Sequence, residues 1–314
     1  MDKQEVYLSV VVPVFNEQES LNELYSRINK ALEEYRDTEI VFVDDGSSDS
    51  SLDILKKFSV DDNKVRVVSL YRNFGQHAAL MAGFKDSYGK IIVTLDADLQ
   101  NPPEEIPKLV SKIEDGFDVV AGKRLDRKDR FMRIVVSVIM NKIISVLTGV
   151  KHTDYGCMLR AYRRPIINCL LDYGEKSVYI PAFTSWLSSN IIEVPVKHES
   201  RAFGVSKYNL LKFCSQSFDL ITAYTLLPIQ LLSFIGIGFS AIGIFLACYL
   251  ISVRLYFGTP SPLTIFISAL LFFSGIIIFS IGVICEYIVR VYRETRKQPL
   301  YIIKEVFSKE SEKI

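Results

Sequence analysis

Apolar and polar positions alternate along the first part of the chain with two different periods. Short apolar, β-branched runs predict buried strands, at 8–14, 39–43, 65–70, 91–96 and 118–121. Polar stretches with an apolar residue every three or four positions predict helices between them, at 18–35, 48–58, 76–87 and 103–115. Strands separated by helices of this length are typical of right-handed βαβ crossovers. The pattern therefore predicts an α/β fold with a mostly parallel sheet.

The pattern changes near Leu226, after which polar residues almost disappear. Residues 228–251 and 263–285 are almost wholly apolar, and each run is long enough to cross a bilayer core of about 30 Å as a helix. The alternative, two buried core helices of a soluble protein, is less favoured because uncharged runs of this length are rare in soluble folds. We therefore expect a two-helix transmembrane hairpin after the α/β domain.

Cations flank the two apolar runs on their outer sides, at Lys197, Arg201, Lys207 and Lys212 and at Arg290, Arg293, Arg296 and Lys297. The positive-inside rule places both flanks in the cytoplasm. The chain then divides into a cytosolic domain (1–208), an amphipathic region (209–227), two spans (228–285) and a cytosolic tail (286–314) that looks loosely ordered after Lys304. The amphipathic region fits a helix on the membrane surface, or one docked on the α/β domain.

Composition excludes several classes of protein. The 314 residues carry a formal net charge of +1, which argues against a nucleic-acid partner, since such proteins normally have a basic face. The 5 cysteines are scattered without a CxxC pair, a pattern that fits a reducing compartment and neither a zinc site nor a disulfide framework. No predicted strand is followed by GxGxxG or GxxxxGK[ST], so a dinucleotide fold and a P-loop are both disfavoured.

Acidic residues follow three of the predicted strands. The strand endings read Pro13-Val14-Phe15-Asn16-Glu17, Asp44-Asp45-Gly46-Ser47 and Asp96-Ala97-Asp98. Parallel strands point the same way, so these endings lie along one edge, where open α/β sheets bind ligands. Carboxylates gathered there repel one another unless a cation or hydrogen-bond donors lie between them. Each ending alone is also explained by turn chemistry or helix capping, but three together favour a binding site.

A uridine nucleotide suits such an edge. An aspartate accepts a hydrogen bond from uracil N3–H, and an acid or a backbone carbonyl takes the ribose hydroxyls. A divalent cation on Asp98 neutralises the diphosphate.

These strand endings resemble the motifs of the large inverting glycosyltransferase family 2, whose members have the GT-A fold. The attached pair of apolar runs resembles the polyprenyl-phosphate glycosyltransferases, the group that includes dolichyl-phosphate mannose synthase. Further motifs, at 72–77, 99–107, 154–164 and 201–208, are similar to the enzymes that transfer 4-deoxy-4-formamido-L-arabinose to undecaprenyl phosphate in lipid A modification. The resemblance covers nearly the whole chain.

The resemblance implies partners and a location. It implies a UDP-sugar donor, undecaprenyl phosphate as acceptor, Mg²⁺ or Mn²⁺ as cofactor, and a multi-pass protein of the bacterial inner membrane. It also suggests a homo-oligomer, with a tetramer as one form.

Roles for particular residues follow from the same resemblance. The nucleotide would be bound by residues from all three strand endings and one later motif: Pro13, Asn16, Glu17, Asp44, Asp45, Asp96 and Arg201. Asp45, with or without Asp44, would read the uracil, and Asp96 would face the ribose and diphosphate. Asp98 would bind the metal, with Gln100 as a second ligand. The lipid phosphate would be held by Arg124, Arg133 and Ser137, and Lys207 would close over the donor diphosphate.

The acceptor implied by the resemblance needs little activation. A phosphate monoester has a second pKa of about 6, so it is already an anion near neutral pH. The enzyme would mainly align the reactants and neutralise charge, and a strong general base is optional. Some relatives carry an acid just after the glycine of the motif, where this chain has Cys157, which we interpret as a packing residue. The acid nearest to Cys157 in sequence is Asp154. It would act as a base or as a group that orients the acceptor, or it is a loop or helix-cap residue.

Other functions stay open at this point. The sugar could be glucose or another hexose, for O-antigen or cell-wall glycosylation. A processive polysaccharide synthase would need a later Gln-x-x-Arg-Trp motif, but the single tryptophan, Trp186, follows Ser185. A non-catalytic membrane scaffold or nucleotide-sugar sensor would be expected to lack one of the strand-end acids.

Overall fold

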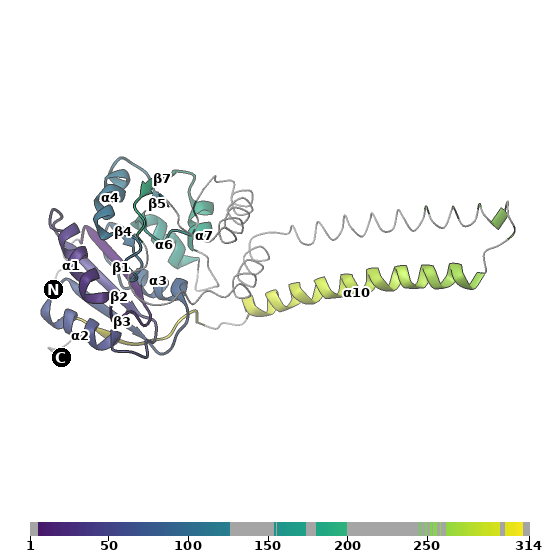
Figure 1. The fold of residues 1–314 in the computed structure, drawn as a ribbon, viewed down its shortest axis with the longest axis horizontal. Coiled ribbons are helices and arrows are strands. Elements are labelled where there is room, and N and C mark those ends of the chain that lie inside the picture. The colour runs from purple at the N-terminus through teal and green to yellow at the C-terminus, as the bar shows by residue number, and fades with distance from the viewer. Residues whose placement is uncertain are drawn as a thin grey trace. The chain divides into compact units, whose positions relative to one another are not determined.

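The structure is a computed structural model that describes residues 6–125, 154, 156–173, 180–199, 262–295 and 299–309, with isolated positions between 245 and 258. The chain forms two units (Figure 1). The first consists of Met1–Asn209 together with Pro299–Ile314, and the second of Leu210–Gln298. The first unit contains the sheet, and the second contains the long helix α10.

The first unit is built on an 8-stranded sheet in the order β7-β5-β6-β4-β1-β2-β3-β8 (Figure 1). The strands are β1 (Leu8–Val14), β2 (Thr38–Asp44), β3 (Val65–Leu70), β4 (Ile91–Thr94), β5 (Val119–Arg124), β6 (Arg160–Arg163), β7 (Ile191–Val196) and β8 (Ile303–Phe307). β1 pairs in parallel with β2 and β4, β2 with β3, and β5 with β7. β6 and β8 run antiparallel to their neighbours. The mostly parallel α/β sheet predicted from the sequence is confirmed.

Helices cover both faces of this sheet. They are α1 (Leu21–Ala31), α2 (Ser51–Asp61), α3 (Gln76–Lys85), the 3-10 turn η1 (Pro103–Glu105), α4 (Ile106–Glu114), α6 (Arg164–Asp172) and α7 (Ile180–Leu187). Successive strand residues point to opposite faces. Val10 and Val12 of β1 share a core with α1, α2 and α4. On the other face, Gly83 of α3 lies so close to Val11 and Val43 that a Cβ would be 2.4 and 3.0 Å from their methyl carbons.

Strands and helices predicted between residues 8 and 121 are present, with boundaries shifted by a few residues. The predicted helix 18–35 is shortened to α1, because the chain before Leu21 forms a turn in which Ser20 N–H donates to Glu17 O at 3.1 Å. The strand predicted to end at 121 continues to Arg124, which pairs with Val196 of β7. The later elements β6, α6, α7, β7 and β8 were not predicted.

The expectation of a loosely ordered tail after Lys304 is wrong for residues 305–307, and residues 310–314 lie outside the described part of the chain. Residues 303–307 form β8, which pairs antiparallel with β3 at the edge of the sheet. Tyr71 N–H donates to Ile302 O at 3.1 Å, and the Lys56 ammonium lies 4.7 Å from the centre of the Phe307 ring. The C-terminal segment is therefore part of the α/β unit, although it follows the whole second unit in sequence.

The second unit is described mainly through α10 (Pro262–Thr295). The predicted apolar run 263–285 lies within this helix, whereas nearly all of 228–251 and all of the amphipathic region 209–227 lie outside the described residues. Within the part of the chain that the structure describes, no helix has the length and apolar character needed to cross a membrane. The hairpin therefore stays a prediction.

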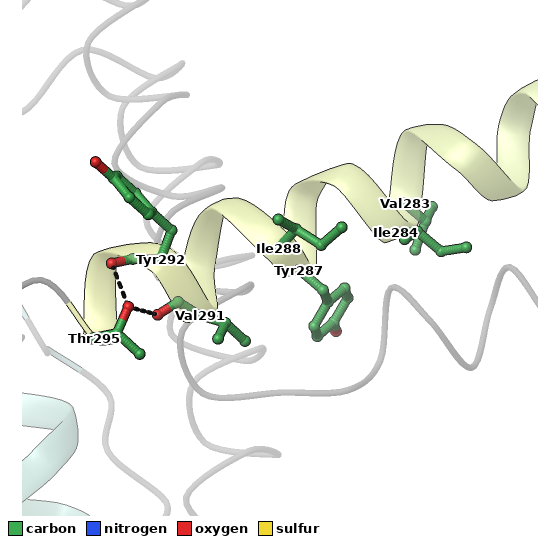
Figure 2. A pocket seen from close by; sticks show the side chains of 7 residues that line it. All are labelled: Val283, Ile284, Tyr287, Ile288, Val291, Tyr292 and Thr295. Carbon is green, nitrogen blue, oxygen red and sulfur yellow. Dashed lines mark hydrogen bonds between the residues drawn. The ribbon is translucent and has the colours of Figure 1, made fainter.

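A hollow along the last turns of α10 is lined almost wholly by apolar atoms (Figure 2). Its lining residues are Val283, Ile284, Tyr287, Ile288, Val291, Tyr292 and Thr295. The Thr295 hydroxyl donates back to the carbonyls of Val291 and Tyr292, each at 3.0 Å, so it offers little to a ligand. The acidic residues of the strand endings do not line this hollow.

Candidate active site

The acidic strand endings come together at one edge of the sheet. β1 lies between β4 and β2, and all three strands run in the same direction. In register, Val14 pairs with Asp44 and Pro13 with Val43, so the ends of β1 and β2 are level. The segments that follow β1, β2 and β4 are consequently neighbours, as parallel pairing requires.

The loops after β1 and β2 are joined by side-chain hydrogen bonds. Asn16, which has a left-handed φ of 55°, accepts a hydrogen bond from Ser48 N–H at 2.8 Å through Oδ1. Its own N–H donates to Ser47 Oγ at 3.0 Å, and Glu17 N–H donates to Ser51 Oγ at 3.0 Å. Buried Asp44 closes the turn by accepting from Ser47 N–H at 3.2 Å. These residues form one connected wall of the site.

Asp45 holds the loop after β3 in place. Its two carboxylate oxygens accept hydrogen bonds from Phe74 N–H at 2.8 Å and Gly75 N–H at 2.9 Å. Burial raises the pKa of this carboxyl group, and the two N–H donors oppose the rise. Gly46, at φ 68°, is required because a Cβ would lie 2.5 Å from the backbone carbon of Arg72. Each oxygen of Asp45 keeps a second lone pair, which is the one a uracil N3–H would need.

Asp96 is the most strongly perturbed acid of the site. Gln76 Nε2 donates to its Oδ1 at 2.6 Å, and Asn101 Nδ2 donates to its Oδ2 at 3.4 Å. Burial, and then the neighbouring charge of Asp98, raise the pKa of Asp96 to about 7, while Arg124 and the two amides act in the opposite direction. The amides are contacts that the sequence analysis missed, although both lie in motifs that it singled out.

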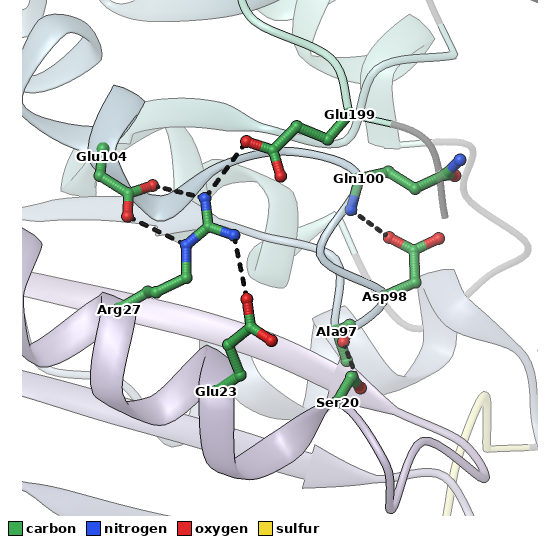
Figure 3. A network of polar contacts seen from close by, with 8 residues as sticks. All are labelled: Ser20, Glu23, Arg27, Ala97, Asp98, Gln100, Glu104 and Glu199. Atoms are coloured by element: carbon green, nitrogen blue, oxygen red, sulfur yellow. Dashed lines mark hydrogen bonds and ion pairs between the residues drawn. The ribbon is translucent and has the colours of Figure 1, made fainter. Parts of the chain in front are cut away.

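Asp98 and Gln100 lie on the loop after β4 (Figure 3). Asp98 Oδ1 accepts a hydrogen bond from Gln100 N–H at 3.1 Å, and Leu99 between them has a left-handed φ of 61°. Among the described residues, no group of three or more His, Cys, Asp or Glu side chains forms a metal cage. The oxygen donors of this loop nevertheless fit Mg²⁺ or Mn²⁺, because Mg²⁺ bound to a nucleotide needs only one or two carboxylates besides the phosphates.

Arg124 and Asp154 form a buried ion pair beside these acids. Arg124 Nε donates to Asp154 Oδ2 and Nη2 donates to Oδ1, both at 2.8 Å, and the side chains are 15% and 4% exposed. The Asp154 N–H donates to Glu193 Oε1 at 3.1 Å. Both carboxylate oxygens of Asp154 are thus engaged by one guanidinium. This geometry favours the orienting role of Asp154 over that of a base, and the assignment remains a prediction.

Cys157 is fully buried, as expected of a packing residue. Its thiol also donates to Asn101 Oδ1 at 3.8 Å, on the side of that amide opposite Asp96. Burial raises the pKa of the thiol to about 12, so it stays protonated. The remaining predicted site residues, Arg133, Ser137, Arg201 and Lys207, lie outside the described residues.

An open, mostly parallel sheet with acids from adjacent strand ends along one edge is the arrangement expected of a glycosyltransferase with the GT-A fold. Comparison with known families agrees: residues 9–171 match the family described as "Glycosyl transferase family 2". The chain belongs to this family.

Curated relatives match almost the full length. A protein of Proteus mirabilis named undecaprenyl-phosphate 4-deoxy-4-formamido-L-arabinose transferase is 43% identical over 305 residues, covering 95% of this chain and 93% of the relative. A protein of the same name from Salmonella paratyphi B is 44% identical over 309 residues, covering 97% and 94%.

Solved structures support the fold alone. Glucosyl-3-phosphoglycerate synthase from Mycobacterium tuberculosis, in complex with Mn²⁺, UDP and phosphoglyceric acid, has a TM-score of 0.50 and 19% identity, over 69% of this chain and 76% of that chain.

Proposed function

We propose that this glycosyltransferase moves 4-deoxy-4-formamido-L-arabinose from its UDP derivative to undecaprenyl phosphate, with inversion at the anomeric carbon. The observation that carries the proposal is the identity of 43% and 44% to two relatives of that name over nearly their whole length. The match covers 95% of this chain and so extends well beyond residues 9–171 of the family domain. Modification of lipid A is the role we infer from these names.

The donor would lie along the edge formed by β1, β2 and β4. Asp45 would accept from the uracil, Asp96 would meet the ribose and diphosphate, and the wall formed by Pro13, Asn16, Glu17 and Asp44 would enclose the nucleoside. Asp98, with Gln100 beside it, would hold Mg²⁺ or Mn²⁺, and the cation would supply charge neutralisation for the diphosphate. Arg201 and Lys207 would add positive charge on the donor side.

The reaction needs alignment more than proton transfer. An oxygen of the lipid phosphate, already anionic near neutral pH, would form the new bond to the anomeric carbon while the bond to UDP breaks. Arg124, Arg133 and Ser137 would hold that phosphate on the face opposite the leaving group. The bidentate contact with Asp154 would fix the orientation of Arg124 and balance its charge until the phosphate arrives.

We also propose that residues 228–285 form a membrane hairpin under a cytoplasmic α/β unit, in the bacterial inner membrane. The apolar runs and their flanking cations support this topology. Pairing of β8 with β3 adds an independent argument, because it returns the chain to the sheet after residues 210–298. A segment that leaves and rejoins one sheet must cross a membrane an even number of times.

A homo-oligomer, such as a tetramer, is part of the proposal, and light scattering in detergent tests it.

Transfer from a panel of radiolabelled UDP-sugars to undecaprenyl phosphate, with and without EDTA, tests the proposed function. We expect EDTA-sensitive transfer of the formamido-arabinose, abolished by Asp98→Asn and kept by Asp53→Asn, a change on the exposed side of α2. Transfer of glucose or another sugar instead would overturn the substrate and keep the reaction class. No transfer from any donor would favour the scaffold function.

A further inference from the structure

Arg27 of α1 lies at the centre of a group of acids (Figure 3). These acids lie next to the segment 95–102 between β4 and η1, which carries Asp98 and Gln100 and which we call the metal loop. Its Nε and Nη2 donate to the two oxygens of Glu104, each at 2.9 Å. Nη2 also contacts Glu199 Oε1 at 3.5 Å, and Nη1 contacts Glu23 Oε1 at 3.5 Å. The Arg27 side chain is only 21% exposed, although its partners are about half exposed. One guanidinium therefore connects three parts of the chain.

Two of these parts border the loop that carries Asp98 and Gln100. Glu104 lies in η1, which directly follows the loop. Glu199 follows β7, and its N–H donates to Gln100 O at 2.8 Å. Arg27 thus holds the far end of the metal loop through Glu104, and it holds the segment bonded to Gln100 through Glu199.

The near end of the same loop is also attached to α1. The hydroxyl of buried Ser20 donates to Ala97 O at 2.8 Å, between Asp96 and Asp98 (Figure 3). Ser20 and Arg27 are seven residues apart and so lie on one face of the helix. α1 consequently holds the loop at two points, one on each side of Asp98.

The contacts with Arg27 suit arginine in particular. Its planar group makes two parallel hydrogen bonds to one carboxylate, which a lysine ammonium cannot do. Hydrogen bonding to Glu104 raises the pKa of Arg27 further above its usual range, and the same contact lowers the pKa of Glu104. Ion pairs whose acid is half exposed contribute little to global stability. We therefore expect that loss of the Arg27 ion pairs leaves the overall fold intact and displaces the metal loop.

We propose that Arg27 is a positioning residue for the metal loop. It acts through its two hydrogen bonds to Glu104 and its contact with Glu199. The inference rests on the proposed function for the identity of the ligand at Asp98. Arg27 itself touches neither Asp98 nor Gln100 in the hydrogen bonds described above, so its effect passes through the backbone of residues 97–104 and through Glu199.

The test compares Arg27→Lys with Arg66→Lys in the full-length protein. Arg66, near the start of β3 and away from the acidic edge, also pairs with a carboxylate, that of Asp86, at 3.5 Å with side chains 26% and 22% exposed. The affinity for UDP in the presence of Mn²⁺ is measured by calorimetry, and the KM for the donor and kcat are measured for transfer. We expect Arg27→Lys to weaken UDP–Mn²⁺ binding and raise KM by about tenfold, the lower range for residues that orient metal ligands. Arg66→Lys should change neither.

Exchanging the charges of residues 27 and 104 distinguishes a positioning role of the ion pair from a general effect of losing a positive charge at residue 27. The double variant Arg27→Glu with Glu104→Arg should recover part of the UDP–Mn²⁺ affinity that Arg27→Glu loses. Equal UDP–Mn²⁺ affinity for Arg27→Lys and the wild type would overturn the inference. So would a fall of the melting temperature in Arg27→Lys that matches its loss of binding, since this would indicate a structural role. Binding is read without transfer, so a wild type that binds UDP–Mn²⁺ but transfers no sugar would refute the proposed function alone.

Discussion

The ion pair of Arg124 with Asp154 allows a quantitative prediction about stability. We consider Asp154→Ala, which removes one partner and leaves a guanidinium that is only 15% exposed. Breaking a buried ion pair in this way costs about 3–5 kcal/mol, because the remaining charge loses its compensation. For a unit of this size, the change corresponds to a fall in melting temperature of about 10 °C.

The pair of Lys112 with Asp115 provides a matched control. Its N–O distance is also 2.8 Å, but its side chains are 40% and 54% exposed. Asp115→Ala should cost only about 0.5 kcal/mol, because water screens the pair. Both variants are compared with the wild type by thermal unfolding in detergent. The double variant Arg124→Met with Asp154→Leu should regain most of the lost stability, since an apolar pair of similar volume replaces a buried ion pair without leaving a charge.

Two results would refute this reasoning. Equal losses of unfolding free energy in Asp154→Ala and Asp115→Ala would mean that burial does not set the strength of an ion pair. A double variant as unstable as Asp154→Ala would mean that the loss of stability does not come from the uncompensated charge of Arg124. Activity gives a separate reading: Asp154→Asn retains the shape of the side chain, and a normal kcat in this variant would exclude Asp154 as a base.

Three further predictions concern the acidic edge. Because the pKa of Asp96 is raised to about 7 and a bound cation favours its ionised form, the affinity for UDP with Mn²⁺ should rise between about pH 6 and pH 8; a flat profile by calorimetry would contradict this. Gln76→Ala removes the 2.6 Å hydrogen bond to Asp96 and should weaken UDP–Mn²⁺ binding about fivefold, whereas Asn63→Ala, at an exposed turn before β3, should not. Burial, and then the charge of Arg160, lower the pKa of His77 from 6.5 to about 4. Between pH 6.5 and about pH 4, His77 is therefore protonated in the unfolded chain but neutral in the folded one. The free energy of unfolding should therefore fall as the pH drops from about 6.5 to about 4, by at most about 3 kcal/mol, and His77→Gln should flatten the profile measured by denaturant unfolding.

Much of the fold follows from hydrophobic periodicity, but not its reversed strands. β1 to β4 are apolar and buried, and parallel pairing alone places their acidic endings on one edge. β6 has the sequence Arg-Ala-Tyr-Arg, which reads as polar. Arg160 is nevertheless fully buried, because its guanidinium donates to the carbonyls of Cys157 at 2.9 Å and Asp154 at 3.4 Å. Such compensation is made by the folded backbone and leaves no periodic pattern.

The candidate site shows the same limit. The sequence indicates that Asp45 and Asp96 reach the acidic edge, but not which groups meet them there. Asp45 is engaged by two N–H groups of the loop after β3, and Asp96 by Gln76 from the start of α3. These partners come from other segments of the chain, the loop after β3 and the start of α3, and only the packing of α3 on the sheet brings them near. β8 is a similar case, because its partner strand β3 lies far away in sequence.

Three observations near the acceptor side bear on the need for a general base in the proposed reaction. Asp154, the nearest acid, has both oxygens bound by Arg124 at 2.8 Å. Cys157, the residue after Gly156, has a pKa raised to about 12 by burial and so remains a neutral donor to Asn101. Asp96 has a raised pKa, but each of its oxygens accepts a hydrogen bond from an amide, that of Gln76 or that of Asn101. In the proposed reaction the acceptor phosphate is already ionised near neutral pH, so it would have no proton to give to any of these groups. If the proposed function holds, catalysis would depend on how rigidly Arg124 and the metal loop are held, which is the property that the Asp154 and Arg27 variants measure.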